Sequence, residues 1–196
     1  MSGFGETDFD RKKEAICYAA AQIFAEKSFE KTTLEEISAG MEMTKAALYH
    51  YFSGKEDILF HCLFLAHSMA NEALSKIVEN KGLPPREKLR LTIREHVRVL
   101  TRKFVYATLR QQDLLLPQKL RNEILEMRKK FQHMFVGIVQ EGVERQSFKV
   151  DNLKMVSFAI LGMVNWVARW YSPDGPFGPE EISDAFCTLI FHGLEK

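Results

Sequence analysis

Residues 32–59 read TTLEEISAGMEMTKAALYHYFSGKEDIL, and this stretch decides the fold. Thr33 is followed three positions later by Glu36, which is the spacing of a capping box, and apolar residues at helical spacing come behind it. Thr44 is a second N-cap, and it opens another short helix that ends near Tyr51. The stretch therefore predicts two short helices that are joined by a tight turn.

The remaining sequence also has helical periodicity and no convincing alternation of apolar and polar residues. Further helices are expected at residues 10–27, 55–79, 86–103, 104–112, 118–145, 152–171 and 179–194. The fold class is therefore all-α, with about nine helices and no sheet.

Composition indicates an ordinary water-soluble protein. The 196 residues are 46% hydrophobic and 27% charged, with a net charge of +1, so the chain can bury a real core. We find no signal peptide and no apolar run of membrane-spanning length, so a cytoplasmic location without membrane attachment is expected. The three cysteines are far apart and are expected to be reduced and buried.

Two short helices with a capped second helix have the form of a helix-turn-helix that reads DNA. Leu48 and Phe52 can turn inward, while Ala46 keeps the helix surface low enough for close approach to a groove. The residues expected to contact phosphates or base edges are Thr33, Thr44, Lys45, Ala46, Tyr49, His50 and Lys55. Residues 1–57 nevertheless carry seven Lys or Arg against eleven Asp or Glu, so any basic face is local.

The tract from Lys45 to Leu59, with its Leu, Tyr, Phe and Lys pattern, resembles the signature of the TetR family of bacterial transcription regulators. The resemblance implies an N-terminal three-helix DNA-binding domain at residues 1–54. It further implies a ligand-binding and dimerisation domain at residues 55–196. A homodimer would bind a palindromic operator in double-stranded DNA, most often as a repressor that a small hydrophobic effector releases.

One position departs from the family pattern. The family usually has glycine in the turn between its second and third helices, and this chain has Glu42 there, with Gly40 two residues earlier. Because a residue with a β-carbon tolerates a positive φ poorly, the sequence predicts a reshaped turn.

The stretch LGMVNWVARWY, residues 161–171, holds two pairs of residues at helical spacing. Asn165 and Arg169 are four apart, as are Trp166 and Trp170, so a polar stripe lies next to an aromatic one. The stretch resembles the subset of the family that senses acyl-coenzyme A thioesters, which implies that these four residues contact the effector or the dimer partner. Both roles stay open for the tryptophans, and Arg169 can equally pair with an acid such as Asp184 or Glu181.

Five arginines recur at every fourth position from residue 86 to residue 102. Each step of four advances the helix by about 40° beyond a full turn, so the five cannot all face one ligand. Most are expected to be solvated. Two or three can meet the phosphates of a coenzyme A group, and Arg98 and Arg102 are the candidates chosen here.

Other function classes find little support in the sequence. The histidines show no metal-ligand spacing, and neither a nucleophile motif nor a phosphate-binding glycine loop is present. No enzyme activity, cofactor or metal is therefore expected. The small molecule that is expected to bind is an effector, and an acyl-coenzyme A thioester is the candidate for it. A helical ligand-binding or adaptor protein that does not bind DNA remains the alternative.

Overall fold

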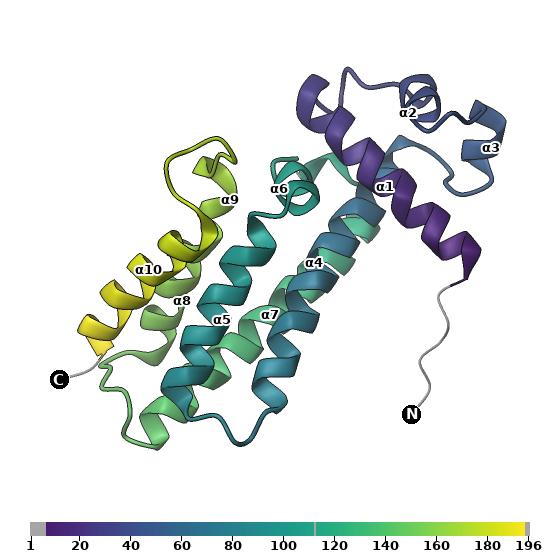
Figure 1. Cartoon of the computed structure of the whole chain (residues 1–196). Helices are drawn as coiled ribbons and strands as arrows, with labels where there is room; N and C mark the ends of the chain where they lie inside the picture. Colours follow the sequence, from purple (N-terminus) through teal and green to yellow (C-terminus); the bar gives the residue numbers. More distant parts are fainter. Residues whose placement is uncertain (1–6, 112, 195–196) are drawn as a thin grey trace. The chain divides into compact units, whose positions relative to one another are not determined.

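The computed structural model describes residues 7–111 and 113–194, and all regular structure within them is helical (Figure 1). The helices are α1 (Asp8–Lys27), α2 (Leu34–Gly40), α3 (Lys45–Tyr49), α4 (Lys55–Glu79), α5 (Pro85–Leu100), α6 (Lys103–Leu109), a 3-10 helix (Asp113–Leu115), α7 (Gln118–Glu144), α8 (Leu153–Asn165), α9 (Val167–Trp170) and α10 (Pro179–Leu194). The all-α prediction is confirmed, with ten α-helices in these two ranges where about nine were expected.

The chain folds into two compact units. Unit 1 contains the residues up to Ala66 together with Ala107–Ile124, and unit 2 contains His67–Tyr106 and the residues from Leu125 onward. The helices α4, α6 and α7 each contribute residues to both units. The compact units divide the chain at other positions than the predicted domain boundary between residues 54 and 55. That boundary, which separates the DNA-binding part from the ligand-binding part, therefore stays a prediction.

No helix in the described part of the chain combines the length and apolar composition that a bilayer span requires. Cys17, Cys62 and Cys187 are free and buried, as the sequence predicted.

Unit 1 has an apolar core to which α1, α2 and α3 all contribute. Ile16, Ala20 and Phe24 on α1 are at most 1% exposed, and their four-residue spacing explains why one side of the helix is buried. Ile37 of α2 and Leu48 of α3 are buried to the same degree, and α2 packs against both of the other helices. Because Leu48 points into this core, the opposite side of α3 faces outward.

The helix starts follow the caps that the sequence predicted. The hydroxyl of Thr33 accepts a hydrogen bond from the Glu36 backbone N–H at 3.2 Å, and the Glu36 side chain accepts one from the Thr33 N–H at 2.9 Å. The Thr44 hydroxyl caps α3 by accepting from the Ala47 N–H at 3.1 Å. These bonds satisfy N–H groups that have no partner inside the helix.

The turn between α2 and α3 is not reshaped, so that expectation was wrong. Glu42 itself adopts the left-handed conformation, with φ of 53°. The Met43 N–H donates to the Ser38 carbonyl at 2.9 Å, and the Glu42 N–H donates to the Ala39 carbonyl at 3.1 Å. These two bonds form a Schellman motif, in which glycine usually occupies the place of Glu42. The backbone bonds and the exposed side chain let glutamate hold this conformation.

In unit 2, α5 packs against α8, α9 and α10 (Figure 1). Its buried side carries Leu89, Ile93 and Val97, all of which are 0% exposed. Since α5 is surrounded by other helices, it positions residues toward both the interior of unit 2 and α10.

The helix expected to end at Tyr171 is interrupted at Trp166. α8 ends at Asn165, and α9 begins again at Val167. The Arg169 N–H donates to the Trp166 carbonyl at 2.9 Å, which is a step of three residues instead of the four of an α-helix. Asn165 and Arg169 therefore do not belong to one continuous helical face.

Replacing Glu42 by glycine is expected to raise the free energy of unfolding by about 1 kcal/mol. A left-handed residue with a β-carbon costs roughly 1–2 kcal/mol, and the greater freedom of glycine in the unfolded chain offsets roughly 0.5–1 kcal/mol of this. Urea unfolding of the Glu42→Gly and Glu42→Ala variants measures the effect. The alanine variant keeps the β-carbon and should gain little. An equal gain in both variants would show that the charge of Glu42, and not its φ, is responsible.

Candidate nucleic-acid interface and effector site

The outward side of α3 and the start of α2 form one surface, which we call the candidate DNA surface. It consists of Thr33, Thr44, Lys45, Ala46, Tyr49 and His50, all of which are exposed. On the same segment Leu48 and Phe52 are buried, as predicted. The structure thus brings six of the seven predicted DNA-binding residues to the outside of the helix pair.

The two threonines of this surface differ in the freedom of their hydroxyl groups. The Thr33 hydroxyl lies 3.2 Å from the Glu36 carboxylate, which accepts its hydrogen. The Thr44 hydroxyl accepts from Ala47, and its own hydrogen has no acceptor within the described residues. Thr44 can therefore cap α3 and donate to a phosphate oxygen at the same time.

Lys45 is already part of an ion pair that sequence reasoning missed. Its Nζ atom lies 2.5 Å from Oε1 of Glu35 on α2. The hydrogen bond between them raises the pKa of Lys45 and lowers the pKa of Glu35. Lys45 must therefore leave or share a carboxylate in order to bind a phosphate. The ten-residue separation of the pair gives no local sequence signal.

Aromatic side chains hold the end of α3 against the start of α1. The Tyr51 ring stacks on Phe9 with 4.9 Å between ring centroids, and His50 meets Phe9 edge-on at 5.7 Å. The ammonium of Lys13 lies 4.9 Å from the centre of the Phe52 ring. These contacts fit the predicted packing role of Tyr51 and Phe52. They also tie His50 to α1, so its ring is held while it remains exposed.

Lys55 occupies a different place from the one that its predicted role requires. Its ammonium donates to the backbone carbonyls of Phe29 at 2.7 Å, Thr32 at 2.9 Å and Glu30 at 3.3 Å. The same ammonium lies 4.5 Å from the centre of the Phe29 ring. All three ammonium hydrogens are thus engaged by the loop between α1 and α2. This geometry favours a structural role for Lys55 over the predicted phosphate contact.

Asn165 connects the surface of unit 2 to a buried histidine. His96 is 8% exposed, and its Nε2–H donates to Oδ1 of Asn165 at 2.7 Å, while Asn165 itself is exposed. Burial lowers the pKa of His96 to about 4, so its ring is neutral at pH 7. Sequence reasoning missed His96. The available signal was that Thr92 and His96 are four apart on α5, on the side away from the arginines.

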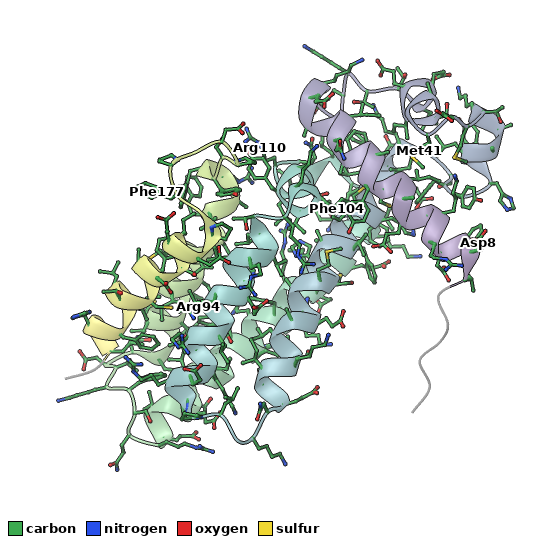
Figure 2. All side chains as sticks on the ribbon, viewed as in Figure 1. Asp8, Met41, Arg94, Phe104, Arg110 and Phe177 are labelled. Atoms are coloured by element: carbon green, nitrogen blue, oxygen red, sulfur yellow. The ribbon has the colours of Figure 1, made fainter. Side chains whose placement is uncertain are left out.

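Three of the five arginines line an open groove between α5 and α10. Arg86, Arg90 and Arg94 face Asp184 and His192 there, around a volume of about 550 Å³. Figure 2 shows Arg94 beside α10, where its guanidinium donates to Asp184 at 2.6 Å. The groove is therefore basic, although its charges are partly paired.

The two arginines that the sequence analysis selected lie elsewhere. Arg98 pairs with Glu95 at 2.6 Å and reaches Glu180 at 3.4 Å, and Arg102 is exposed beyond the end of α5. Arg90 and Arg94 are each two positions from Thr92, and Arg94 is two positions from His96, which corresponds to about 200° around the helix. The groove and the buried histidine are thus on nearly opposite sides of α5.

The tryptophans and Arg169 are all on the surface of the single chain. Trp166 is 63% exposed and Trp170 is 45% exposed. The acids considered as partners of Arg169 are engaged elsewhere, since Asp184 pairs with Arg94 and Glu181 accepts from the Gly178 N–H at 2.8 Å. The structure does not bring these residues to a closed site in one chain, so contact with an effector or with a second chain stays a prediction.

Two family models match the chain. The model of bacterial regulatory proteins of the tetR family matches residues 16–62, which include α2 and α3. The model of the tetracyclin repressor-like C-terminal domain matches residues 82–194. Together they span most of the described residues.

Full-length relatives agree with these matches. The HTH-type transcriptional repressor KstR2 of Mycolicibacterium smegmatis is 25% identical over 191 residues, or 94% of this chain and 91% of KstR2. The solved TetR family regulator PfmR from Thermus thermophilus is 32% identical, with a TM-score of 0.85 over 92% of this chain and 99% of PfmR. AibR, solved in complex with isovaleryl coenzyme A and operator DNA, is 26% identical, with a TM-score of 0.81 over 92% of this chain and 98% of AibR.

Replacing Lys55 by methionine is expected to lower the free energy of unfolding by about 2–3 kcal/mol, because three backbone carbonyls lose a charged donor. Chemical denaturation measures this loss. Lys31→Met, which removes an exposed lysine from the same loop, should change stability by less than about 0.5 kcal/mol. If Lys55→Met left stability unchanged and weakened only DNA binding, Lys55 would instead be a phosphate contact.

The buried His96 is expected to make stability depend on pH. Its pKa is near 6.5 in the unfolded chain and about 4 in the folded chain, so the unfolded chain binds the proton first as the pH falls. The resulting stabilisation, about 3 kcal/mol, is complete above pH 6.5 and is lost as the pH falls toward 4. Denaturant titrations at several pH values should show this component in the wild type and not in His96→Leu. Parallel pH profiles in the two proteins would contradict the assignment.

Proposed function

The chain belongs to the TetR family of bacterial transcriptional regulators, and on that premise we propose that it is a homodimeric repressor. It binds a palindromic operator in the cytoplasm, and a small effector releases it from the DNA. Membership in a family of regulators also agrees with the expectation that the chain is not an enzyme.

The orientation of α3 is the observation that carries the DNA-binding part of the proposal. Leu48 anchors the helix in the core of unit 1, so Thr44, Lys45 and Tyr49 are left on the outer side. Ala46 adds only a methyl group to this side, which allows the backbone to come close to a groove. Threonine, lysine and tyrosine side chains donate hydrogen bonds to phosphates and base edges.

Exposed apolar side chains on unit 2 support the homodimer. Leu189 on α10 is 66% exposed, and Met155 and Phe158 on α8 are exposed together with the two tryptophans. Large apolar side chains that stay exposed on a single chain are typical of an interface between proteins when they lie together. In a twofold dimer, each chain presents the same surface to its partner, and the two α3 helices meet successive major grooves about 34 Å apart.

An acyl-coenzyme A thioester is the effector class that we propose, since AibR was solved with isovaleryl coenzyme A. Asn165 supports this choice because it reaches from the surface to the buried His96. Arg169, Arg98 and Arg102 offer exposed guanidinium groups to the anionic part of such a molecule. Trp166 and Trp170 lie in the same segment as Arg169 and serve either the effector or the dimer interface.

Continuous helices provide a route from the effector to the DNA. The helices α4, α6 and α7 each belong partly to unit 1 and partly to unit 2. An effector that binds one arrangement of these helices more tightly shifts the population toward it. Release follows if that arrangement holds the two α3 helices at a spacing that the operator does not match.

The proposal predicts a salt-sensitive, sequence-selective gel shift with DNA that flanks the protein's own gene. Lys45→Met should weaken binding about tenfold or more and reduce the slope of log affinity against log salt by about 2, because the dimer loses two phosphate contacts. Lys76→Met is the matched control, since Lys76 is an exposed lysine of unit 2 that pairs with Glu72. It should leave the affinity and the slope unchanged.

Acyl-coenzyme A thioesters of varied chain and ring structure are then added to the protein–DNA complex. Release by at least one of them supports the proposed effector class. If DNA binds and no thioester releases it, the effector proposal fails while the DNA-binding proposal stands. If no sequence-selective binding occurs even in a random-site selection, the chain is instead a ligand-binding or adaptor protein that does not bind DNA.

A further inference from the structure

Three polar side chains in the interior of unit 2 each have an atom without a hydrogen-bond partner among the described residues. The atoms are Oδ1 of Asn71, Oγ1 of Thr92 and Nδ1 of His96. Asn71 and His96 are 8% exposed, and Thr92 is 2% exposed. Buried polar atoms are nearly always hydrogen-bonded in folded proteins, so three such atoms in one unit require an explanation.

Two of the three residues contact neighbouring turns of α7. Asn71 donates from Nδ2 to the carbonyl of Met127 at 3.2 Å, and the His96 ring lies 4.5 Å from the ring of Phe131. Met127 and Phe131 are one helical turn apart, as are Thr92 and His96 on α5. Asn71 from α4 and His96 from α5 therefore approach the same short segment of α7, and Thr92 lies one turn from His96. We call these three residues the interior polar cluster.

The cluster lies in surroundings that favour apolar side chains. Leu74 follows Asn71 on α4, Ile93 follows Thr92 on α5, and Phe135 lies one turn beyond Phe131 on α7, and all three are at most 2% exposed. A valine in place of Thr92 would fill the same space without leaving an unpaired hydroxyl. A buried polar group without a partner lowers stability, and a bound ligand can supply the partner that is missing.

The hydrogen-bonding capacity of the cluster defines the missing partner. The His96 Nε2–H donates to Asn165, so the neutral ring presents Nδ1 as an acceptor. Asn71 uses its amide hydrogens on the carbonyls of His67 and Met127, which leaves Oδ1 as an acceptor as well. Thr92 can donate or accept. The complementary group thus donates at least one hydrogen bond and can also accept one, as a hydroxyl group does.

We propose that the interior polar cluster of Asn71, Thr92 and His96 binds a hydroxyl group within the apolar part of the effector. The inference rests on the proposed function, because it assumes that the effector enters unit 2. It narrows the effector class to acyl groups that carry a hydroxyl on their chain or ring, in preference to their plain saturated counterparts. The charged part of the effector stays outside, since the cluster holds no charged group.

The test measures binding directly, without DNA, by isothermal titration calorimetry of the dimer of the 196-residue chain. The probes are matched pairs of coenzyme A thioesters: octanoyl with 3-hydroxyoctanoyl, octanoyl with 8-hydroxyoctanoyl, and cyclohexanecarbonyl with 4-hydroxycyclohexanecarbonyl. For at least one pair, the hydroxylated member should bind wild-type protein about tenfold or more tightly than its parent. The ratio of the two dissociation constants within a pair is the readout.

Thr92→Val tests the cluster itself. It should bring the ratio to within about threefold of one, mainly by weakening the binding of the hydroxylated member of the pair. It should also raise the thermal midpoint of the free protein by about 3 °C, because an unpaired buried hydroxyl is removed. Thr101→Val is the matched control on the same helix, since the Thr101 hydroxyl donates to the Val97 carbonyl at 3.0 Å. That variant should lower the midpoint and keep the ratio.

Equal affinities within every pair, or a ratio that Thr92→Val does not change, would overturn the inference. A lower thermal midpoint in Thr92→Val would also overturn it, because the hydroxyl would then have a partner, such as a trapped water, in the free protein. If no thioester binds at all, the inference fails together with the proposed effector class. A gel shift on the operator shows in each case whether the DNA-binding proposal still holds.

Discussion

The left-handed turn at Glu42 is the constraint on which the candidate DNA surface depends. Two backbone hydrogen bonds close the end of α2 at this residue, and they fix the direction in which α3 begins. Only with that direction can Leu48 enter the core of unit 1 while Tyr49, the next residue, remains half exposed. The left-handed conformation of Glu42 thus determines which side chains of α3 are exposed. Glycine, which the family usually has at this position, adopts a positive φ without strain, whereas Glu42 adopts it at a cost in conformational energy.

Local signals explain why most of the fold could be predicted from the sequence. Helix starts follow from caps such as Thr33 and Thr44, and buried sides follow from spacing, so both depend on residues only three or four positions apart. The outcome at Lys55 depends on carbonyls more than twenty positions away, which no local pattern specifies. The break between α8 and α9 at Trp166 could not be predicted, because no proline or glycine occupies that position. The features that could not be predicted are therefore those that depend on tertiary contacts.

The same distinction applies to the two candidate sites. The exposure of the six residues of the candidate DNA surface could be predicted because a two-helix motif places them on its outer side. The effector residues were predicted from two conspicuous segments, residues 161–171 and the arginine repeat, and of those residues only Asn165 is hydrogen-bonded to a buried side chain within the described residues. The interior polar cluster escaped notice because Asn71, Thr92 and His96 lie on two helices, and each resembles an ordinary polar residue. Its significance comes from burial without a partner, which only a three-dimensional structure can reveal.

The division of α5 into two polar sides has a physical basis that bears on the effector. A guanidinium is too costly to bury without an anionic partner, so Arg90 and Arg94 lie on the side of the open groove, where Glu87 and Asp184 pair with them. The interior side carries Lys88, whose charge is already paired with Glu141 of α7 at 2.8 Å, together with Thr92 and His96. Burial keeps His96 uncharged by lowering its pKa to about 4. An interior of this kind can accept a neutral polar group but not a phosphate. An effector with both must therefore place them in different surroundings, with its anionic part at exposed arginines and its neutral part against the interior polar cluster.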